Sequence, residues 1–256
     1  MSLEKEKYIN KILQLLPEGV VAPSSWFAQN GISAQLLHKY AQNEWLEKLE
    51  RSAYIKKNCV PSWQGAVLGL TSFEHKPFHI GGITALNLQG YAHYLPIGAQ
   101  NIHLYGTDNP PFWIANLKLQ ESLVFHKKPD FKQKGLKEYQ TSIRNLNIPI
   151  SSPERAILEL LYLTEKGGFS FEFIGEIFEG LTNLRPDLLN ELLTACDNIK
   201  IKRLFLFFSN HYKHPWSKYI ETDNLSLGSG KLQIAKDGKL DKTYLITIPK
   251  GLSNAT

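Results

Sequence analysis

Short apolar stretches at helical spacing alternate with turn residues over the first sixty positions. Apolar side chains follow a helical pattern over residues 4–16, and a proline and a glycine end it. A second helix is expected over 24–30, with Gly31 as its stop, and a third over 33–43. The apolar residues of 46–56 flank a short charged turn, as in a hairpin. This order predicts a winged helix-turn-helix.

Beyond Pro61 the pattern predicts a larger domain of mixed helices and strands. Helices are expected at 63–70, 82–90, 151–163, 171–180, 186–196 and 200–209, strands at 101–106, 122–126 and 139–146, and a final hairpin that turns at 237–238. The sequence therefore predicts an α+β fold. A winged helix-turn-helix would span residues 1–60, and a larger mixed α+β domain would span residues 61–256.

Serines mark the predicted starts of three helices. Ser24 or Ser25 is expected to cap the second helix, and Ser33 the third. The segment SSPERAILELLYL allows two caps. If Ser152 is the cap, a proline occupies the first helical position, where its missing N–H costs nothing. If Ser151 is the cap, a glutamate completes a capping box.

The outward face of the third helix carries the residues expected to meet DNA. With its apolar residues turned inward, this helix presents Ser33, Gln35, His38, Lys39 and Gln42, and the predicted wing at 47–54 adds Lys48 and Arg51. Glutamine can pair bidentately with adenine, and lysine can reach guanine or a phosphate. The helix is therefore expected in the major groove, with the wing beside the phosphates.

Acidic residues on the wing favour a different use of the same lobe. Glu47 and Glu50 lie on or beside the wing, and residues 1–60 hold eight Lys or Arg against six Asp or Glu. So small a surplus attracts phosphates only weakly. The alternative to DNA binding is a protein-interaction module.

The length and composition of the chain are those of a globular protein with a substantial core. The chain has 256 residues, of which 43% are hydrophobic and 21% charged. Its charged start lacks the apolar region of a signal peptide, and its apolar runs are too short to span a bilayer. Two cysteines far apart make no disulfide framework. A cytoplasmic location without a membrane partner is therefore expected.

The basic excess of the chain lies after the first sixty residues. The net charge is +5, with six Lys or Arg against two Asp or Glu over 126–144 and five against one over 196–218. These segments predict a second basic surface for nucleic acid or an acidic partner, made of Lys127, Lys128, Lys132, Lys134, Lys137, Lys200, Lys202 and Arg203. The alternative is an ordinary solvated surface.

Fragments that resemble phosphate or zinc sites are incomplete. The GSGK at 228–231 has leucines where a phosphate-binding loop needs an earlier glycine and a following hydroxyl residue. A proline separates His75 from His79 and breaks the helix that would align them. No cysteine or paired acid accompanies His211 and His214.

A nuclease-like acid pair is also incomplete. Asp130 and Glu138 approximate the carboxylates that hold a catalytic metal, but the lysine expected two residues after the glutamate is Gln140. The expectation is a protein that is not an enzyme and has no cofactor and no metal. A degenerate metal-dependent nuclease remains an alternative.

Several motifs in a fixed order resemble a known family. PEGVV, WF, GIS, LLHKY, WLEKL and the AY of the hairpin resemble the N-terminal winged helix of antitoxins from AbiE-type abortive-infection (type IV toxin–antitoxin) systems. WQGAVLGL, HIGGITALNLQGYAHYLP, NPPFWI, SPERAILELL and IKRLFLFF resemble pieces of the second domain of those proteins. The resemblance thus covers most of the chain.

The resemblance implies a transcriptional regulator that represses its own operon. It also implies an antitoxin that counteracts a nucleotidyltransferase-like toxin encoded beside it. The expected partners are double-stranded DNA at the chain's own operator, bound by the winged helix, and the cognate toxin. The second domain is implicated in neutralisation, with or without direct contact.

Overall fold

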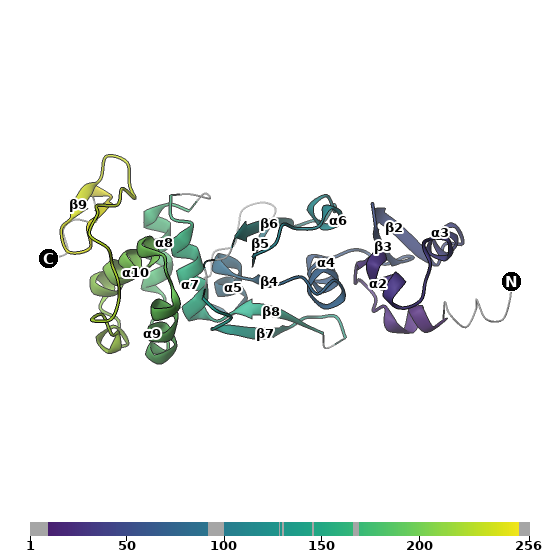
Figure 1. Ribbon diagram of the computed structural model, residues 1–256, viewed down its shortest axis with the longest axis horizontal. Helices are drawn as coiled ribbons and strands as arrows, with labels where there is room; N and C mark the ends of the chain where they lie inside the picture. The colour runs from purple at the N-terminus through teal and green to yellow at the C-terminus, as the bar shows by residue number, and fades with distance from the viewer. Residues whose placement is uncertain are drawn as a thin grey trace. The chain divides into compact units, whose positions relative to one another are not determined.

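The contacts of the chain divide it into two compact units, and neither is a continuous stretch of sequence. The computed structural model describes residues 10–91, 100–127, 129, 131–144, 146–165 and 169–250 (Figure 1). The first unit comprises Met1–Ile80, Pro96–Lys127 and Glu138–Ile150, and the second comprises Gly81–Leu95, Lys128–Lys137 and Ser151–Thr256. The predicted division at residue 60 does not coincide with this one. The α+β class is confirmed.

The N-terminal part of the first unit contains the helices and the hairpin that the sequence predicts. Residues 10–15 are helical. The elements that follow are β1 (Ala22–Pro23), α2 (Ser24–Gln29), α3 (Ala34–Gln42), β2 (Leu46–Glu50) and β3 (Ala53–Lys56). Gly31 turns the chain between α2 and α3 with φ +82°, a conformation that favours glycine. The strands pair in the order β1-β3-β2.

The two predicted caps of this lobe have different outcomes. Ser33 caps α3 as expected, and its hydroxyl oxygen accepts a hydrogen bond from the N–H of Leu36 at 3.2 Å. The serine cap of α2 is wrong, because Pro23 occupies the cap position and Ser24 is already helical. The N–H of Ser24 instead donates to the carbonyl of Ser52 at 2.9 Å.

Close packing of α4 explains why residue 60 is not a boundary of the contacts. α4 (Trp63–Leu68) continues into a π-helical turn, η1 (Gly69–Phe73). A Cβ on Gly65 would lie 1.8 Å from the carbonyl oxygen of Gly19, and one on Gly69 would lie 1.9 Å from that of Val21. Only glycine permits so close an approach of the two backbones. Residues on both sides of position 60 therefore share one core.

A five-stranded mixed sheet follows, in the order β6-β5-β4-β8-β7. Its strands are β4 (Phe78–Ile80), β5 (Asn101–Gly106), β6 (Ser122–Lys127), β7 (Leu136–Gln140) and β8 (Asn147–Ser151). β5 runs antiparallel to β4 and parallel to β6, and β8 runs parallel to β4. The strands expected at 101–106 and 122–126 are confirmed.

The single strand expected at 139–146 is wrong, because the chain turns there. The Thr141 hydroxyl donates to the carbonyl of Leu146 at 2.8 Å and closes a turn between β7 and β8. β8 also contains Pro149, which is unusual in an interior strand because proline has no N–H to donate.

Helices dominate the second unit. They are α5 (Gly82–Leu88), α7 (Pro153–Tyr162), α8 (Phe171–Glu179), α9 (Pro186–Ala195) and α10 (Ile199–Tyr212). α7 contacts α5, α8, α9 and α10, and the green helices of Figure 1 gather around it. Its cap is Ser152, with Pro153 at the first helical position, which decides between the two predicted caps.

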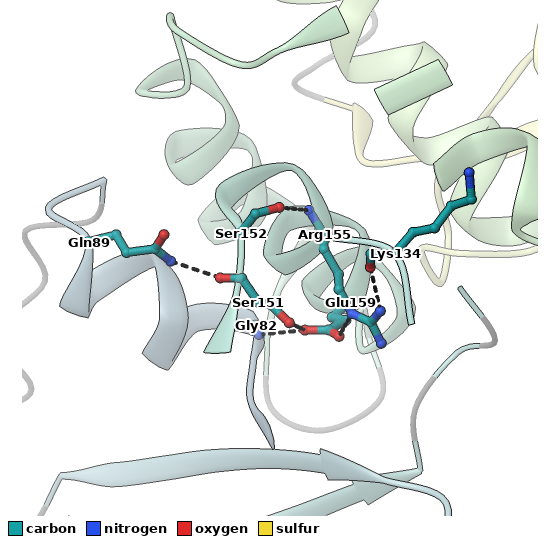
Figure 2. Close-up of polar contacts among 7 residues, drawn as sticks. All are labelled: Gly82, Gln89, Lys134, Ser151, Ser152, Arg155 and Glu159. Atoms are coloured by element: carbon teal, nitrogen blue, oxygen red, sulfur yellow. Dashed lines mark hydrogen bonds and ion pairs between the residues drawn. The ribbon is translucent and has the colours of Figure 1, made fainter. Parts of the chain in front are cut away.

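A buried ion pair lies on one side of α7. The guanidinium Nε of Arg155 donates to the carboxylate of Glu159 at 2.8 Å, and both side chains are fully buried. Figure 2 shows the other oxygen of this carboxylate between the Ser151 hydroxyl at 2.8 Å and the Gly82 N–H at 3.1 Å. Arg155 Nη1 donates to the carbonyl of Lys134 at 2.6 Å. The pair therefore joins α5, α7 and the loop before β7.

The final hairpin exists but turns later than expected. β9 (Lys239–Asp241) pairs antiparallel with β10 (Ile246–Ile248). The predicted turn at 237–238 is wrong, because the Asp241 carboxylate accepts a hydrogen bond from the Tyr244 N–H at 2.7 Å and turns the chain there.

Three histidines and a tyrosine gather on one face of the sheet. The register pairs His79 with Tyr105 and Tyr105 with His126, so their side chains share a face. Nδ1 of His103 lies 2.8 Å from Nε2 of His126, and their rings are stacked. Burial, and then repulsion by His126, lower the pKa of His103 from 6.5 to about 4.

Replacing Glu159 with alanine is expected to destabilise the protein strongly, because the charge of Arg155 would stay buried without a partner. The expected loss is about 3–5 kcal/mol of unfolding free energy, measured by urea denaturation. Glu191→Ala is the matched control, since it breaks the largely exposed pair of Glu191 with Lys134. That control should cost about 0–1 kcal/mol. Equal losses in the two variants would contradict the structural role of the buried pair.

The pKa of His103 predicts a loss of stability in weak acid. Because the folded pKa lies below the unfolded one, the contribution of His103 is complete above pH 6.5 and is lost as the pH falls toward about 4. Urea midpoints should fall more steeply in wild type than in His103→Asn as the pH decreases through this window. His38→Asn, at an exposed position, is the control that should follow wild type. Parallel pH profiles for wild type and His103→Asn would rule out this role.

Candidate nucleic-acid interface

α3 is divided into a buried face and an exposed polar face. Leu37 and Tyr40 point into the core, each only 2% exposed, and the ring of Tyr40 lies beside that of Trp45. The predicted contact residues Ser33, Gln35, His38, Lys39 and Gln42 are all exposed. The apolar face holds the helix in place, so the polar side chains are presented from a fixed backbone.

The β2–β3 hairpin carries the two predicted wing residues. Lys48 and Arg51 are both exposed. Ser52 completes the turn with φ +69°, and its carbonyl accepts a hydrogen bond from Ser24 at the start of α2. This bond fixes the tip of the wing to the helical part of the lobe.

Two of the acidic residues of this lobe, Glu44 and Glu50, have polar partners. Glu50 accepts a hydrogen bond from the Arg51 N–H at 3.1 Å, so its carboxylate is engaged by the turn itself. Glu44 pairs with Lys57 at 3.5 Å. Glu47 is exposed, but side chains alternate across a strand, so it points to the opposite face from Lys48. A duplex bound through Lys48 would therefore lie on the other side of the strand from the Glu47 carboxylate.

A small hollow beside the wing tip was not foreseen from the sequence. It is lined by Arg51, Ser52, Phe112 and Trp113. Phe112 begins the short helix α6 (Phe112–Ala115), and its side chain is 62% exposed. The proline pair before it marks a break in regular structure, but no local pattern indicates that the wing lies nearby.

The prediction that Lys200, Lys202 and Arg203 form a basic surface is wrong. Lys202 and Arg203 are buried, at 6% and 2% exposed. Lys200 Nζ donates to the carbonyls of Tyr162 and Thr164, where α7 ends. Lys200 thus binds carbonyls at the end of α7, as basic residues near a helix C-terminus do.

Arg203 binds the segment that contains the GSGK motif. Its guanidinium donates to the carbonyls of Leu227 at 2.7 Å, Gly228 at 2.8 Å, Gly230 at 2.6 Å and Leu245 at 3.2 Å. The glycines therefore turn carbonyls inward around a cation, whereas a phosphate-binding loop directs N–H groups at an anion.

The lysines of the other predicted basic segment are distributed unevenly. Lys134 pairs with Glu191 at 2.6 Å, so its charge is compensated. Lys127, Lys132 and Lys137 are exposed, and their role as a second surface stays a prediction. Lys128 lies outside the described residues.

In the described part of the chain, the nuclease-like and zinc-like fragments do not come together as a metal site. Asp130 lies outside the described residues, and Glu138 accepts a hydrogen bond from Asn147 at 2.6 Å. His214 Nε2 lies 2.9 Å from the carbonyl of Phe178. Across the described ranges, no three histidine, cysteine or acidic side chains gather as a metal site would require.

None of the described helices has the length and apolar character needed to cross a bilayer.

These features define a candidate DNA-binding protein of α+β fold. The family model described as "Transcriptional regulator, AbiEi antitoxin, Type IV TA system" matches residues 99–249. A second, described as "Transcriptional regulator, AbiEi antitoxin N-terminal domain", matches residues 5–97. The chain therefore belongs to the AbiEi antitoxin family, as its motifs indicated.

The chain is similar in fold to a solved structure. The RV2827C protein from Mycobacterium tuberculosis matches with a TM-score of 0.55 and 13% sequence identity, over 89% of this chain and 85% of that chain. No curated protein matches the chain. At this identity the likeness concerns the fold alone.

Arg203→Ala is expected to destabilise the protein and loosen the C-terminal segment, because four carbonyls would lose a charged donor. We expect a loss of at least about 3 kcal/mol in unfolding free energy and faster proteolysis within 227–245. Lys231→Ala, which removes an exposed cation from the same segment, is the control and should change neither measurement. Normal stability with reduced binding of nucleic acid would instead restore Arg203 as a surface residue.

Proposed function

We propose that the chain binds the operator of its own operon through α3 and the β2–β3 wing, and represses transcription there. The observation that carries the proposal is the two-faced construction of α3. Leu37 and Tyr40 fix one face, while the polar residues of the other are exposed. A helix held in this way can enter the major groove without a change of backbone.

The proposed mechanism divides base reading from phosphate binding. The Gln35 carboxamide pairs with the N6 and N7 groups of an adenine, and Lys39 donates to guanine or to a phosphate. Ser33 keeps its hydroxyl proton for a phosphate, since its oxygen already accepts the Leu36 N–H. Lys48 and Arg51 bind phosphates from the wing and set the register of α3.

The antitoxin role completes the proposal. Members of this family are described as antitoxins of type IV toxin–antitoxin systems. We infer that the toxin counteracted by this chain resembles a nucleotidyltransferase, and that the chain acts in the cytoplasm without catalysis, cofactor or metal. Exposed Lys132 and Lys137 of the second unit, and separately Lys127 of the first, are the remaining candidates for contact with an RNA or nucleotide substrate.

A protein-interaction role for the same lobe is the competing proposal, favoured by exposed Glu47. The salt dependence of the binding affinity distinguishes DNA binding from binding of a protein partner. The affinity for DNA should fall linearly on a logarithmic plot against salt concentration, with a slope set by the number of phosphates contacted. Binding of a protein partner through largely uncharged groups would not show this slope.

Gln35→Ala with Lys39→Ala is expected to weaken operator binding by about tenfold or more, and to reduce the preference over a scrambled duplex. The reason is the loss of two side chains assigned to bases. The measurement is a gel shift with the chain's own upstream region. Gln233→Ala with Lys236→Ala, two exposed residues of the second unit, is the matched control. Unchanged affinity and selectivity in the α3 variant would contradict the proposal that α3 binds in the major groove.

A further inference from the structure

An exposed aromatic side chain lies beside the proposed wing. Phe112 is 62% exposed, whereas the next two residues, Trp113 and Ile114, are buried at 3% and 2%. Two prolines precede it, and Pro111 provides the extended residue from which α6 begins. The sequence NPPFWI thus places one large apolar ring in solvent at a fixed point of the chain.

The core of the first unit fixes this ring relative to the wing. Val21, Ala53 at the start of β3, Trp113 and Ile114 belong to one buried cluster. The Trp113 indole N–H donates to the Glu74 carboxylate at 3.0 Å. Wing and α6 are therefore parts of one packed body, although they are separated by about sixty residues of sequence.

Arg51 is the cation that lines the hollow. Glu50, the residue before it, accepts a hydrogen bond from the Arg51 backbone N–H, and Glu74 accepts one from the Trp113 indole. Both carboxylates are thus bonded to N–H donors. Within the described part of the chain, by contrast, no carboxylate pairs with the guanidinium of Arg51. A cation next to an exposed ring is left facing solvent.

We propose that α6 extends the DNA interface beyond the winged helix. Arg51 binds a backbone phosphate, and Phe112 packs against the adjoining deoxyribose at the edge of the minor groove, beside the wing. Apolar side chains are a recurrent means of contact with the minor groove. The proposal rests on the proposed DNA binding and adds to it a contact that α3 and the hairpin alone lack.

A duplex fits this surface better than an apolar protein groove does. The hollow joins one ring to one guanidinium, which is the pairing of apolar sugar and charged phosphate that repeats along DNA. The ring carries no charge, so its contribution should not vary with salt. Binding of Arg51 to a phosphate releases a counterion from the DNA, so the contribution of Arg51 to affinity should fall as the salt concentration rises.

The test measures binding of the full chain to a duplex of its own upstream region by fluorescence anisotropy over a series of salt concentrations. Phe112→Ala should lower affinity about tenfold at every salt concentration, with the slope unchanged. Arg51→Gln should reduce the slope by about one. Tyr219→Ala, which removes an exposed aromatic ring from the second unit, is the control and should bind as wild type does.

Phe112→Tyr separates contact from folding, because it keeps the ring. Retained binding by Phe112→Tyr, with the unfolding midpoint of Phe112→Ala unchanged, supports the contact. Loss of binding that accompanies a lowered midpoint in both variants would show a structural role and overturn the proposal. If wild type binds the duplex and Phe112→Ala binds equally well, this inference alone fails, even when Phe112→Ala loses affinity for a toxin. If wild type binds no duplex, the proposed function fails with it.

Discussion

The buried pair of Arg155 and Glu159 is the contact on which the second unit depends. The pair holds together the amide of Gly82, the hydroxyl of Ser151 and the carbonyl of Lys134. Each of these residues lies within four positions of a point where the chain passes between the two units. A unit made of separate stretches needs bonds between its entry points, and a desolvated ion pair supplies directional ones. Hydrophobic contact alone would leave the register of these segments less defined.

In the first unit, separate segments are held together by close backbone packing at glycines, whereas a buried ion pair does this in the second. Gly65 and Gly69 let the backbone of α4 and η1 approach the carbonyls of Gly19 and Val21. The small lobe that reads as a separate domain in sequence is thereby joined to the elements that follow it. Rigidity of this kind suits the proposed DNA binding, because contacts to bases would require α3 and the β2–β3 hairpin to keep a fixed spacing.

Local signals predicted many of the helices, strands and caps, whereas contacts between residues far apart in the sequence could not be predicted from them. Gly31, the Ser33 cap and the alternation around the hairpin each act within a few residues, and the sequence predicts all three correctly. The role of Arg203 depends on carbonyls more than twenty positions away, so its charge alone suggested a surface. Phe112 lies beside Arg51 only because a shared core brings them together. The motifs placed the chain in its family although several of its contacts could not be inferred from them.

The interleaving of the two units has a consequence for synthesis of the chain. The first unit includes Glu138–Ile150, so more than half of the 256 residues must leave the ribosome before that unit is complete. The N-terminal lobe and the glycines of α4 and η1 that support it lie within the first eighty residues. Folding of domains generally proceeds from the N-terminus during translation. The segment proposed to bind DNA is therefore synthesised well before the strand that completes the sheet of the same unit.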